Sequence, residues 1–292
     1  MAEGGAEAGT GPGRALPQAV IADLFRAACL AELDALKPGN VHAYAAGHRM
    51  EVDDFVTSAA VAAPPLAEAG AAVGRRVRGA VEATMAAVGQ NTNLGILLLC
   101  APLAAAAESA RPLGQALRGV LGGLDARDGA EVFAAILAAN PGGLGRAAGH
   151  DVAGPAPPLA EAMAEAAPRD RIARAYVTGF EDLFAIGLPA LAAARAKGLA
   201  PPWSTTAIHL AFLTGVPDSH IARKFGPERA ESVRAEAAAA LGALTPGEAT
   251  RDTLLAHDRR LKEAGLNPGT SADFTVATLF LDALLRARGE AA

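Results

Sequence analysis

The chain has 292 residues, of which 51% are hydrophobic and 4% are aromatic, and its formal net charge is −5. This length fits one large domain or two small ones, and the weakly negative charge excludes a protein that coats nucleic acid with a basic surface. Much of the apolar content is alanine, which favours helices strongly but fills a core poorly. We therefore expect closely packed helices with Leu, Val, Ile and Phe between them.

The N-terminal segment 1–16 is rich in Gly and Ala and lacks the basic and apolar regions of a signal peptide, so we expect a disordered tail. No uncharged apolar stretch reaches the ~20 residues of a membrane span. Cys29 and Cys100 lie in apolar runs, which predicts buried thiols and neither a zinc site nor a disulfide. The sequence thus predicts a cytoplasmic protein without membrane contact.

Apolar residues recur at helical spacing along most of the chain after residue 16, whereas no run alternates as a strand would. Segment 94–109 is apolar on all sides, which predicts a central buried helix. We expect an all-α single domain over 17–289, a multi-helix bundle whose inter-helix loops form a polar cleft. The predicted helices cover 15–36, 53–63, 66–88, 94–109, 112–121, 129–139, 157–165, 170–197 with a kink at 187–189, 204–213, 218–225, 227–240, 247–265 and 270–288.

Polar side chains gather in five segments between these helices, and loops on a rigid scaffold are where binding and catalytic sites are usually built. We therefore expect Lys37, His42, Asn91, Asp218 and Asp273 to line one cleft at the helix ends. The five segments are 37–49, 89–95, 140–151, 218–224 and 267–273.

The first polar segment follows the first predicted helix and begins with "KPGNVH". Pro38-Gly39 fixes a turn, and an Asn in the next position can bond the local backbone. A helix stop, with Lys37 complementing the helix dipole, and a binding site fit this pattern about equally well. The side chains available to a site are Lys37, Asn40, His42, His48 and Arg49.

The second polar segment, "GQNTN", follows a mostly apolar helix that carries Glu82 two turns earlier. Glu82 could face either solvent or the cleft. A glycine C-cap at Gly89 and an Asn or Thr N-cap explain one or two of the four polar residues 90–93, but not all of them. Asn91 and Asn93 are therefore binding candidates.

The third and fourth segments carry most of the remaining histidines and basic residues. His150 and Asp151 are adjacent and do not share a helix face, so they make no strong metal pair. In "PDSHIARKFG", Asp218 is predicted to cap a short helix, and a solvated charged face explains the rest without a site. The binding candidates here are His150, His220, Arg223 and Lys224.

The fifth segment, "NPGTSADFTVATLFL", has the clearest helix start of the chain, because Thr270 to Asp273 fit a capping box before an apolar run. A helix N-terminus also binds anions, although an Asp there competes with phosphate. A divalent cation that bridges Asp273 and a phosphate would remove this conflict. Asn267 and Ser271 are further binding candidates.

The common nucleotide-binding and hydrolase motifs of α/β proteins are absent from the sequence. Five segments instead follow one another between about residues 23 and 285: "LKPGNVH", "GHRMEVDDFVTSAA", "VGQNTNLGILLLCAPLA", "PDSHIARKFG" and "NPGTSADFTVATLFLDALL". In this order they resemble the triphosphoribosyl-dephospho-CoA synthase family, which makes the prosthetic-group precursor of citrate lyase and malonate decarboxylase.

The resemblance implies an all-helical enzyme that joins ATP to 3′-dephospho-CoA. The 2′-hydroxyl of dephospho-CoA attacks C1 of the ATP ribose, adenine leaves, and the triphosphate stays on the transferred ribose. This chemistry needs carboxylates near an oxocarbenium-like centre, a base for the hydroxyl, and Mg²⁺ with basic side chains for the triphosphate.

Residue roles follow from the resemblance and from the polar segments. We expect Asp218 and Asp273 to bind Mg²⁺. The candidate catalytic residues are Glu82, His42 and Asp218. The candidate triphosphate ligands are Lys37, Arg223 and Lys224, with His48 and Arg49 second.

Departures from the citrate-lyase members leave the acceptor open. Asn93-Leu94 stands where those members have His-Lys, and Ser219-His220 stands where they have Thr-Asn. "KPGNVH" and "DSHIARKFG" look more like a divergent branch associated with methanopterin-type cofactor genes. The acceptor is therefore dephospho-CoA or a related cofactor.

Two other functions also fit the residues. A magnesium-dependent helical ADP-ribosyl or nucleoside glycohydrolase would use water as the acceptor and release free triphosphoribose or ribose phosphate. A non-catalytic helical protein that only binds a nucleotide would release no adenine, and the clusters of Glu, Asp and His weigh against it. A homodimer is compatible with the sequence, and no nucleic-acid partner is expected.

Overall fold

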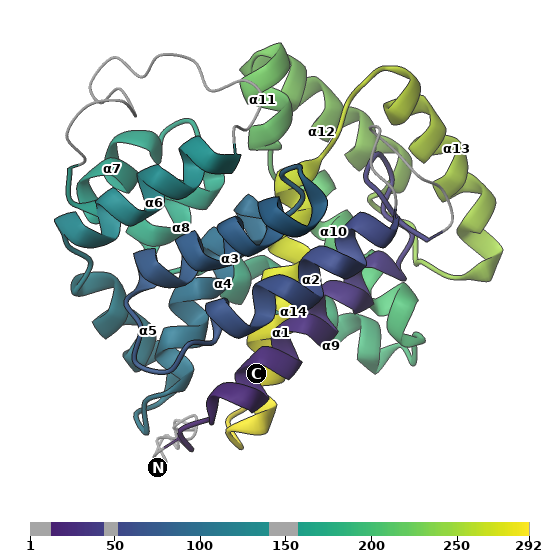
Figure 1. Ribbon diagram of the computed structural model, residues 1–292. Helices are drawn as coiled ribbons and strands as arrows, with labels where there is room; N and C mark the ends of the chain where they lie inside the picture. The colour runs from purple at the N-terminus through teal and green to yellow at the C-terminus, as the bar shows by residue number, and fades with distance from the viewer. Residues whose placement is uncertain (1–12, 44–51, 140–156, 292) are drawn as a thin grey trace, which may run out of the picture.

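The computed structural model describes residues 13–43, 52–139 and 157–291, and over these ranges the chain forms fourteen α-helices and no strand (Figure 1). The predicted all-α fold is confirmed. The helices are α1 (Gln18–Leu33), α2 (Val52–Leu66), α3 (Val73–Val88), α4 (Leu94–Ala107), α5 (Leu113–Gly122), α6 (Ala126–Ala139), α7 (Leu159–Ala166), α8 (Arg171–Thr178), α9 (Leu188–Ala196), α10 (Pro201–Gly215), α11 (Ser219–Phe225), α12 (Pro227–Leu241), α13 (Arg251–Glu263) and α14 (Gly269–Ala287).

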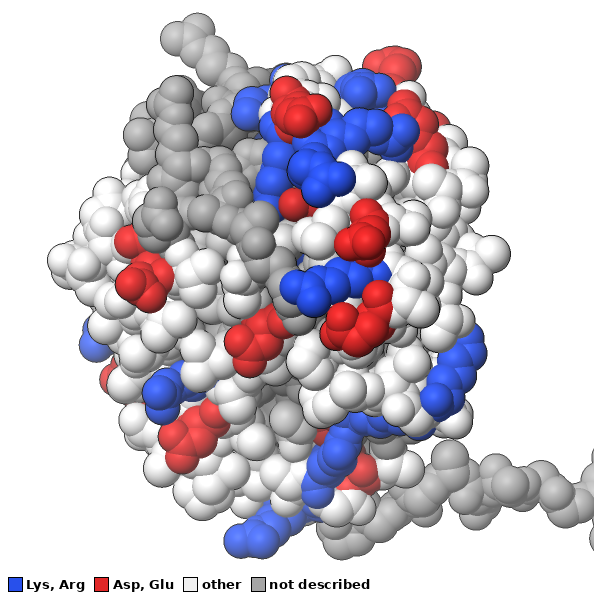
Figure 2. All heavy atoms as spheres, turned by 90° about the vertical axis from the view of Figure 1, so that its right-hand side faces the viewer, with Lys and Arg blue, Asp and Glu red and all other residues white. Residues whose placement is uncertain are grey.

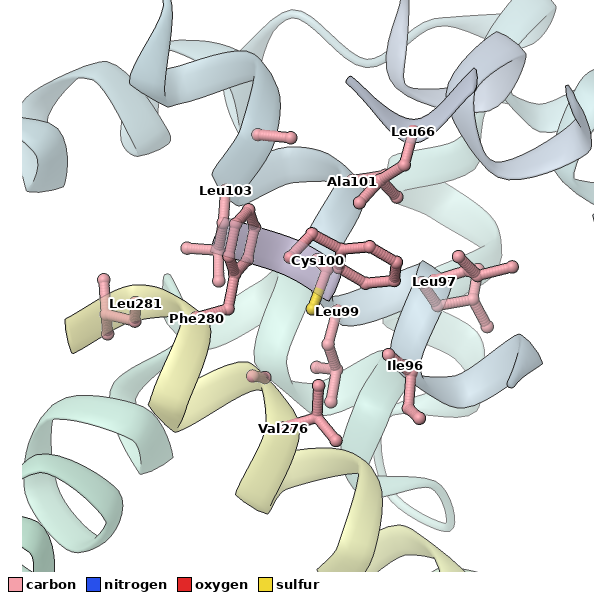
Figure 3. Packing of buried hydrophobic residues seen from close by; sticks show 14 of the residues in the cluster. Leu66, Ile96, Leu97, Leu99, Cys100, Ala101, Leu103, Val276, Phe280 and Leu281 are labelled. Atoms are coloured by element: carbon pink, nitrogen blue, oxygen red, sulfur yellow. The ribbon is translucent and has the colours of Figure 1, made fainter. Parts of the chain in front are cut away.

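Helix α4 forms the centre of the core, as its uniformly apolar sequence predicts. Twelve of its fourteen residues are buried. Figure 3 shows the side chains of α4 and α14 that meet here, among them Leu99, Leu103, Val276 and Phe280. Each buried side chain of this size contributes about 1.5–3 kcal/mol. Helix α14, which also contacts α1, α10 and α11, is therefore held firmly where its N-terminus enters the polar region.

The long helix predicted over 170–197 is wrong, because the chain bends by 97° between α8 and the following helix. Gly179 and Phe180 both have positive φ, 66° and 65°, and end α8. This helix end could not be predicted from the residue type at position 180, since a buried Phe rarely has a positive φ. At the kink expected at 187–189, the structure instead has a π-helical turn, Leu183–Gly187, which continues directly into α9.

Two further predicted boundaries differ from the structure. Helix α2 runs through Pro64 and Pro65 to Leu66, so the prolines occupy its last turn and do not end it. The next helix begins at Val73, because 67–72 form a turn around Gly70, whose φ is 69°. The buried guanidinium of Arg76 fixes this turn by donating to the carbonyls of residues 66 and 71.

The expected N-terminal tail is ordered at its end, since Leu16 is buried and donates its backbone N–H to Ala107 at the end of α4. Residues 1–12 lie outside the described ranges. Figure 2 shows Lys and Arg interspersed with Asp and Glu on one face of the molecule. Among the ion pairs of α12 and α13, Glu236 lies within 4.0 Å of both Arg229 and Arg260. Among the described helices, none taken singly is long and apolar enough to cross a membrane.

Candidate active site

The loop that follows α1 is buried against α13, where Asp258 holds it. One oxygen of Asp258 accepts a hydrogen bond from the backbone N–H of Gly39 at 2.8 Å and lies 3.4 Å from Nε2 of His42. The other oxygen accepts from Lys262 at 3.0 Å. A single carboxylate on a distant helix therefore fixes both the backbone and the imidazole of this loop.

His42 and its neighbours lie inside the protein. The side chain of His42 is 0% exposed, and burial lowers its pKa, while the contact with Asp258 raises it in part. Behind the loop, Nε2 of the buried His209 lies 3.4 Å from the carbonyl oxygen of Pro38, and burial lowers the pKa of His209 to about 3. The expected catalytic contact of His42 with substrate is not supported, because the side chain is enclosed and points to Asp258.

Lys37 does not reach towards a phosphate either. Its ammonium group is fully buried and donates to Glu32 of α1, to Oδ1 of Asn40 at 3.2 Å and to the carbonyl of Val41 at 2.7 Å. An ammonium group has three N–H donors, and all three are used. The role predicted for Lys37 is therefore corrected: the residue anchors the loop, and Glu32 is its partner.

The same loop is linked to the start of α14. The side-chain amide of Asn40 donates to Oδ1 of Asn267 at 2.8 Å; Asn40 is buried and Asn267 is half-buried. Two of the predicted binding residues are thus brought together. The contact joins the first and the fifth polar segments.

Asp218 connects two helix N-termini. Its Oδ1 accepts the backbone N–H groups of His220 and Ile221, which confirms the predicted cap of α11. Its Oδ2 accepts both the backbone N–H and the hydroxyl of Ser271 in α14. A carboxylate offers about four acceptor sites, so these four donors occupy it. The predicted metal and catalytic roles of Asp218 are not supported.

Asp273 has the opposite environment. Its carboxylate lies against the Cα of Gly95 in the first turn of α4, and no described residue donates a hydrogen bond to it. Burial raises the pKa of Asp273 well above its ordinary range, and the negative charges of Asp218 and Glu32 raise it further. Arg223 is close enough to lower it in part. The predicted capping box is wrong, since α14 has no side-chain cap at its N-terminus.

The side chains of the segment before α4 bind its own backbone and the neighbouring helices. Oδ1 of Asn91 accepts the backbone N–H of Leu94 at 3.1 Å, and the amide of the buried Asn93 donates to the hydroxyl of Thr84 at 3.0 Å.

Asn93 also lines a narrow cleft between α1, α2 and α4. The other polar groups in its wall are Cys29, Glu32 and Ser58, and the apolar wall includes Phe55 and Ile96.

The basic residues of α11 are at the surface. Arg223 is partly exposed and donates to Asp170, the N-cap residue of α8, at 2.8 Å. Lys224 is exposed and lies 5.2 Å from the centre of the Phe225 ring. The imidazole of His220 is next to Gly269 at the start of α14. His220 therefore lies where the N-termini of α11 and α14 meet, whereas Arg223 and Lys224 lie in the last turn of α11.

Some predicted residues lie elsewhere. Glu82 is 54% exposed and pairs with Arg78 at 2.7 Å, and Arg78 also binds Glu131 of α6. Glu82 therefore faces solvent on the α6 side, and its predicted catalytic role is not supported. Three predicted binding residues fall outside the described ranges: His48, Arg49 and His150.

Several residues of this region were not predicted. Glu32 lies in the last turn of α1. A Glu five positions before a Lys does not by itself indicate that the two side chains form a buried ion pair. Asp258 lies on α13, whose many charges resemble a solvated face. In the part of the chain that the structure describes, no three His, Cys, Asp or Glu side chains form a metal-binding group.

A family model and a solved structure both match this chain. A family model described as ATP:dephospho-CoA triphosphoribosyl transferase matches residues 18–291. A crystal structure from Archaeoglobus fulgidus, which carries the provisional name triphosphoribosyl-dephospho-CoA synthase, matches with a TM-score of 0.59 and 27% identity over 78% of this chain and 97% of that chain. No curated protein matches. The chain belongs to the ATP:dephospho-CoA triphosphoribosyl transferase family.

Proposed function

We propose that the protein transfers the triphosphoribosyl group of ATP to dephospho-CoA, or to a related cofactor that offers a hydroxyl group, and releases adenine. Family membership supports the reaction. The observation that carries the site is the Asp273 carboxylate, which lies on the first turn of α4 without a described hydrogen-bond donor. Such a carboxylate is unfavourable for folding alone and is typical of positions that receive a cation or a reacting group.

Asp273 is the residue that we expect to hold Mg²⁺. This cation takes oxygen ligands, usually one or two carboxylates together with phosphate oxygens and water. Asp273 has both oxygens available, whereas Asp218 has neither. Bound there, Mg²⁺ would neutralise charge on the triphosphate. Asp218 contributes indirectly, because it holds Ser271 and with it the turn of α14 that carries Asp273.

The triphosphate itself needs donors, and α11 carries Arg223, which is close enough to Asp273 to lower the pKa of that carboxyl. Arg223 pairs with Asp170 at a partly exposed position, where such a pair is worth little and can exchange for phosphate. Lys224 and His220 lie on the same short helix. Asn91, Asn93 and Asn267 border the region and can bind ribose or phosphate oxygens by hydrogen bonds. Lys37 is excluded from this set by its burial.

Glu32 is the carboxylate that we expect to move a proton, in place of Glu82. One of its oxygens accepts from Lys37, and the other has no described donor. Glu32 also lines the cleft that Asn93 borders. Burial raises its pKa, while Lys37 lowers it. In this position Glu32 can accept the proton of the attacking hydroxyl.

The test is product analysis by mass spectrometry. The protein is incubated with ATP and Mg²⁺, either with dephospho-CoA or with pterin cofactors as acceptors. We expect equimolar adenine and a triphosphoribosyl adduct of one acceptor, and loss of both products with Asp273→Asn. Free triphosphoribose with no adduct would show a glycohydrolase, and no adenine with any acceptor would overturn the proposal. Since the substrates are metabolites of the cytoplasm, we expect the protein there.

A further inference from the structure

Gly95 is the second residue of α4 and is the place where Asp273 of α14 approaches this helix most closely. A Cβ atom on Gly95 would lie 2.5 Å from Cγ of Asp273, 3.0 Å from its Oδ1 and closer still to its Oδ2. In proteins a Cβ atom essentially never comes closer than 3.0 Å to such atoms of another side chain. Any side chain at position 95 would therefore displace the Asp273 carboxylate.

Two unfavourable features coincide at this contact. Glycine lowers the stability of a helix relative to alanine, and α4 is otherwise built from Leu, Ile, Ala, Cys and Pro. A partly buried carboxylate without a donor also lowers the stability of the fold. The close contact comes from the end of the Asp273 side chain, so an alanine at 273 would leave room for a Cβ at 95.

We infer that Gly95 is a positioning residue for the reaction: its missing side chain lets α14 set the Asp273 carboxylate on the first turn of α4. There the carboxylate lies at the positive end of a 14-residue helix, with Asn93 and the cleft beside it. The inference rests on the proposed function of Asp273. It assigns to Gly95 the placement of that carboxylate and no contact with substrate.

The first test compares two glycine substitutions at equivalent helix positions. Gly114 is the second residue of α5, and no atom lies closer than 4.0 Å to a Cβ placed there. We expect Gly114→Ala to raise the melting temperature by about 1–3 °C and to leave turnover unchanged. We expect Gly95→Ala to lower kcat/KM for ATP by about 100-fold and to raise the Mg²⁺ concentration for half-maximal rate. Wild-type kinetics in Gly95→Ala would overturn the inference.

The second test is a double-mutant cycle read by thermal unfolding, which needs no activity. In an Asp273→Ala background the clash is gone, so Gly95→Ala should raise the melting temperature as Gly114→Ala does. In an Asp273→Asn background the amide keeps the size of the carboxylate, so Gly95→Ala should still lower it. An equal loss in all backgrounds would show that Gly95 does not act through Asp273. If the cycle succeeds and no transfer occurs with any acceptor, the proposed function fails and the contact stands.

Discussion

Ser271 donates two hydrogen bonds to a single oxygen of Asp218, one from its backbone N–H at 2.8 Å and one from its hydroxyl at 2.9 Å. The other oxygen of Asp218 caps α11. Asp218 and Ser271 are 53 positions apart along the chain, and this one buried side chain thereby joins the N-termini of α11 and α14. This junction determines what should happen when Asp218 is changed.

Asp218→Asn should mainly lower stability. An amide nitrogen in place of one oxygen would face N–H or O–H donors, so at least two hydrogen bonds are lost and two buried donors are left unpaired. We expect the free energy of unfolding to fall by about 2–4 kcal/mol, measured by urea denaturation. Asp170→Asn, which changes the cap of α8 and its partly exposed pair with Arg223, is the control and should cost less than about 1 kcal/mol, because Asn caps a helix about as well as Asp. A stable Asp218→Asn protein with an altered Mg²⁺ requirement would restore the metal role.

Lys37→Met should also affect the fold more than ATP binding. It leaves the buried carboxylate of Glu32 without its partner, which costs about 3–5 kcal/mol in buried pairs. Adding Glu32→Gln should recover most of this loss. The exposed pair of Arg75 and Glu68 is the control, and Arg75→Met should change the free energy of unfolding by less than about 0.5 kcal/mol. A raised KM for ATP at unchanged stability would contradict the anchoring role.

Asp273→Asn should stabilise the metal-free protein at neutral pH. Burial and neighbouring negative charge raise the folded-state pKa of Asp273 above its unfolded value. The native state therefore binds this proton more tightly, and wild-type stability falls as the pH rises from the unfolded value through the folded one. Melting temperatures in EDTA should be higher for the variant at pH 7.5 and should converge with wild type near pH 4. A lower melting temperature for the variant at pH 7.5 would mean that the carboxylate stabilises the fold.

Glu82→Gln should leave turnover within about twofold of wild type, because its exposed pair with Arg78 contributes little. Glu32→Gln should lower kcat by at least about 100-fold if Glu32 moves the proton of the acceptor. The two variants are compared by adenine release at saturating ATP. A large loss with Glu82→Gln and none with Glu32→Gln would return the role to Glu82.

Sequence patterns predicted the features that depend on local chemistry. The apolar run of α4 marked the core, and the Asp before Ser219 marked the cap of α11. They failed where a partner is remote. The three acceptors of Lys37 lie within five residues of it, but the sequence does not show that this loop is buried. Its burial depends on remote elements such as α13, where Asp258 binds the backbone of Gly39. The polar segments 37–42, 218–220 and 267–273 do lie together, as predicted. The hydrogen bonds that join them, however, use several of the side chains that were predicted to bind substrate or metal.

The bond between Gly39 and Asp258 has a consequence for synthesis of the protein. The two residues are separated by 219 positions, so at about 5–20 residues per second the ribosome needs roughly 10–40 s to make the second after the first. During that time α1 and its loop carry a lysine and a histidine meant for the interior, while α13 and α14 do not yet exist. The nascent chain therefore has to keep this region unaggregated until its last helices emerge.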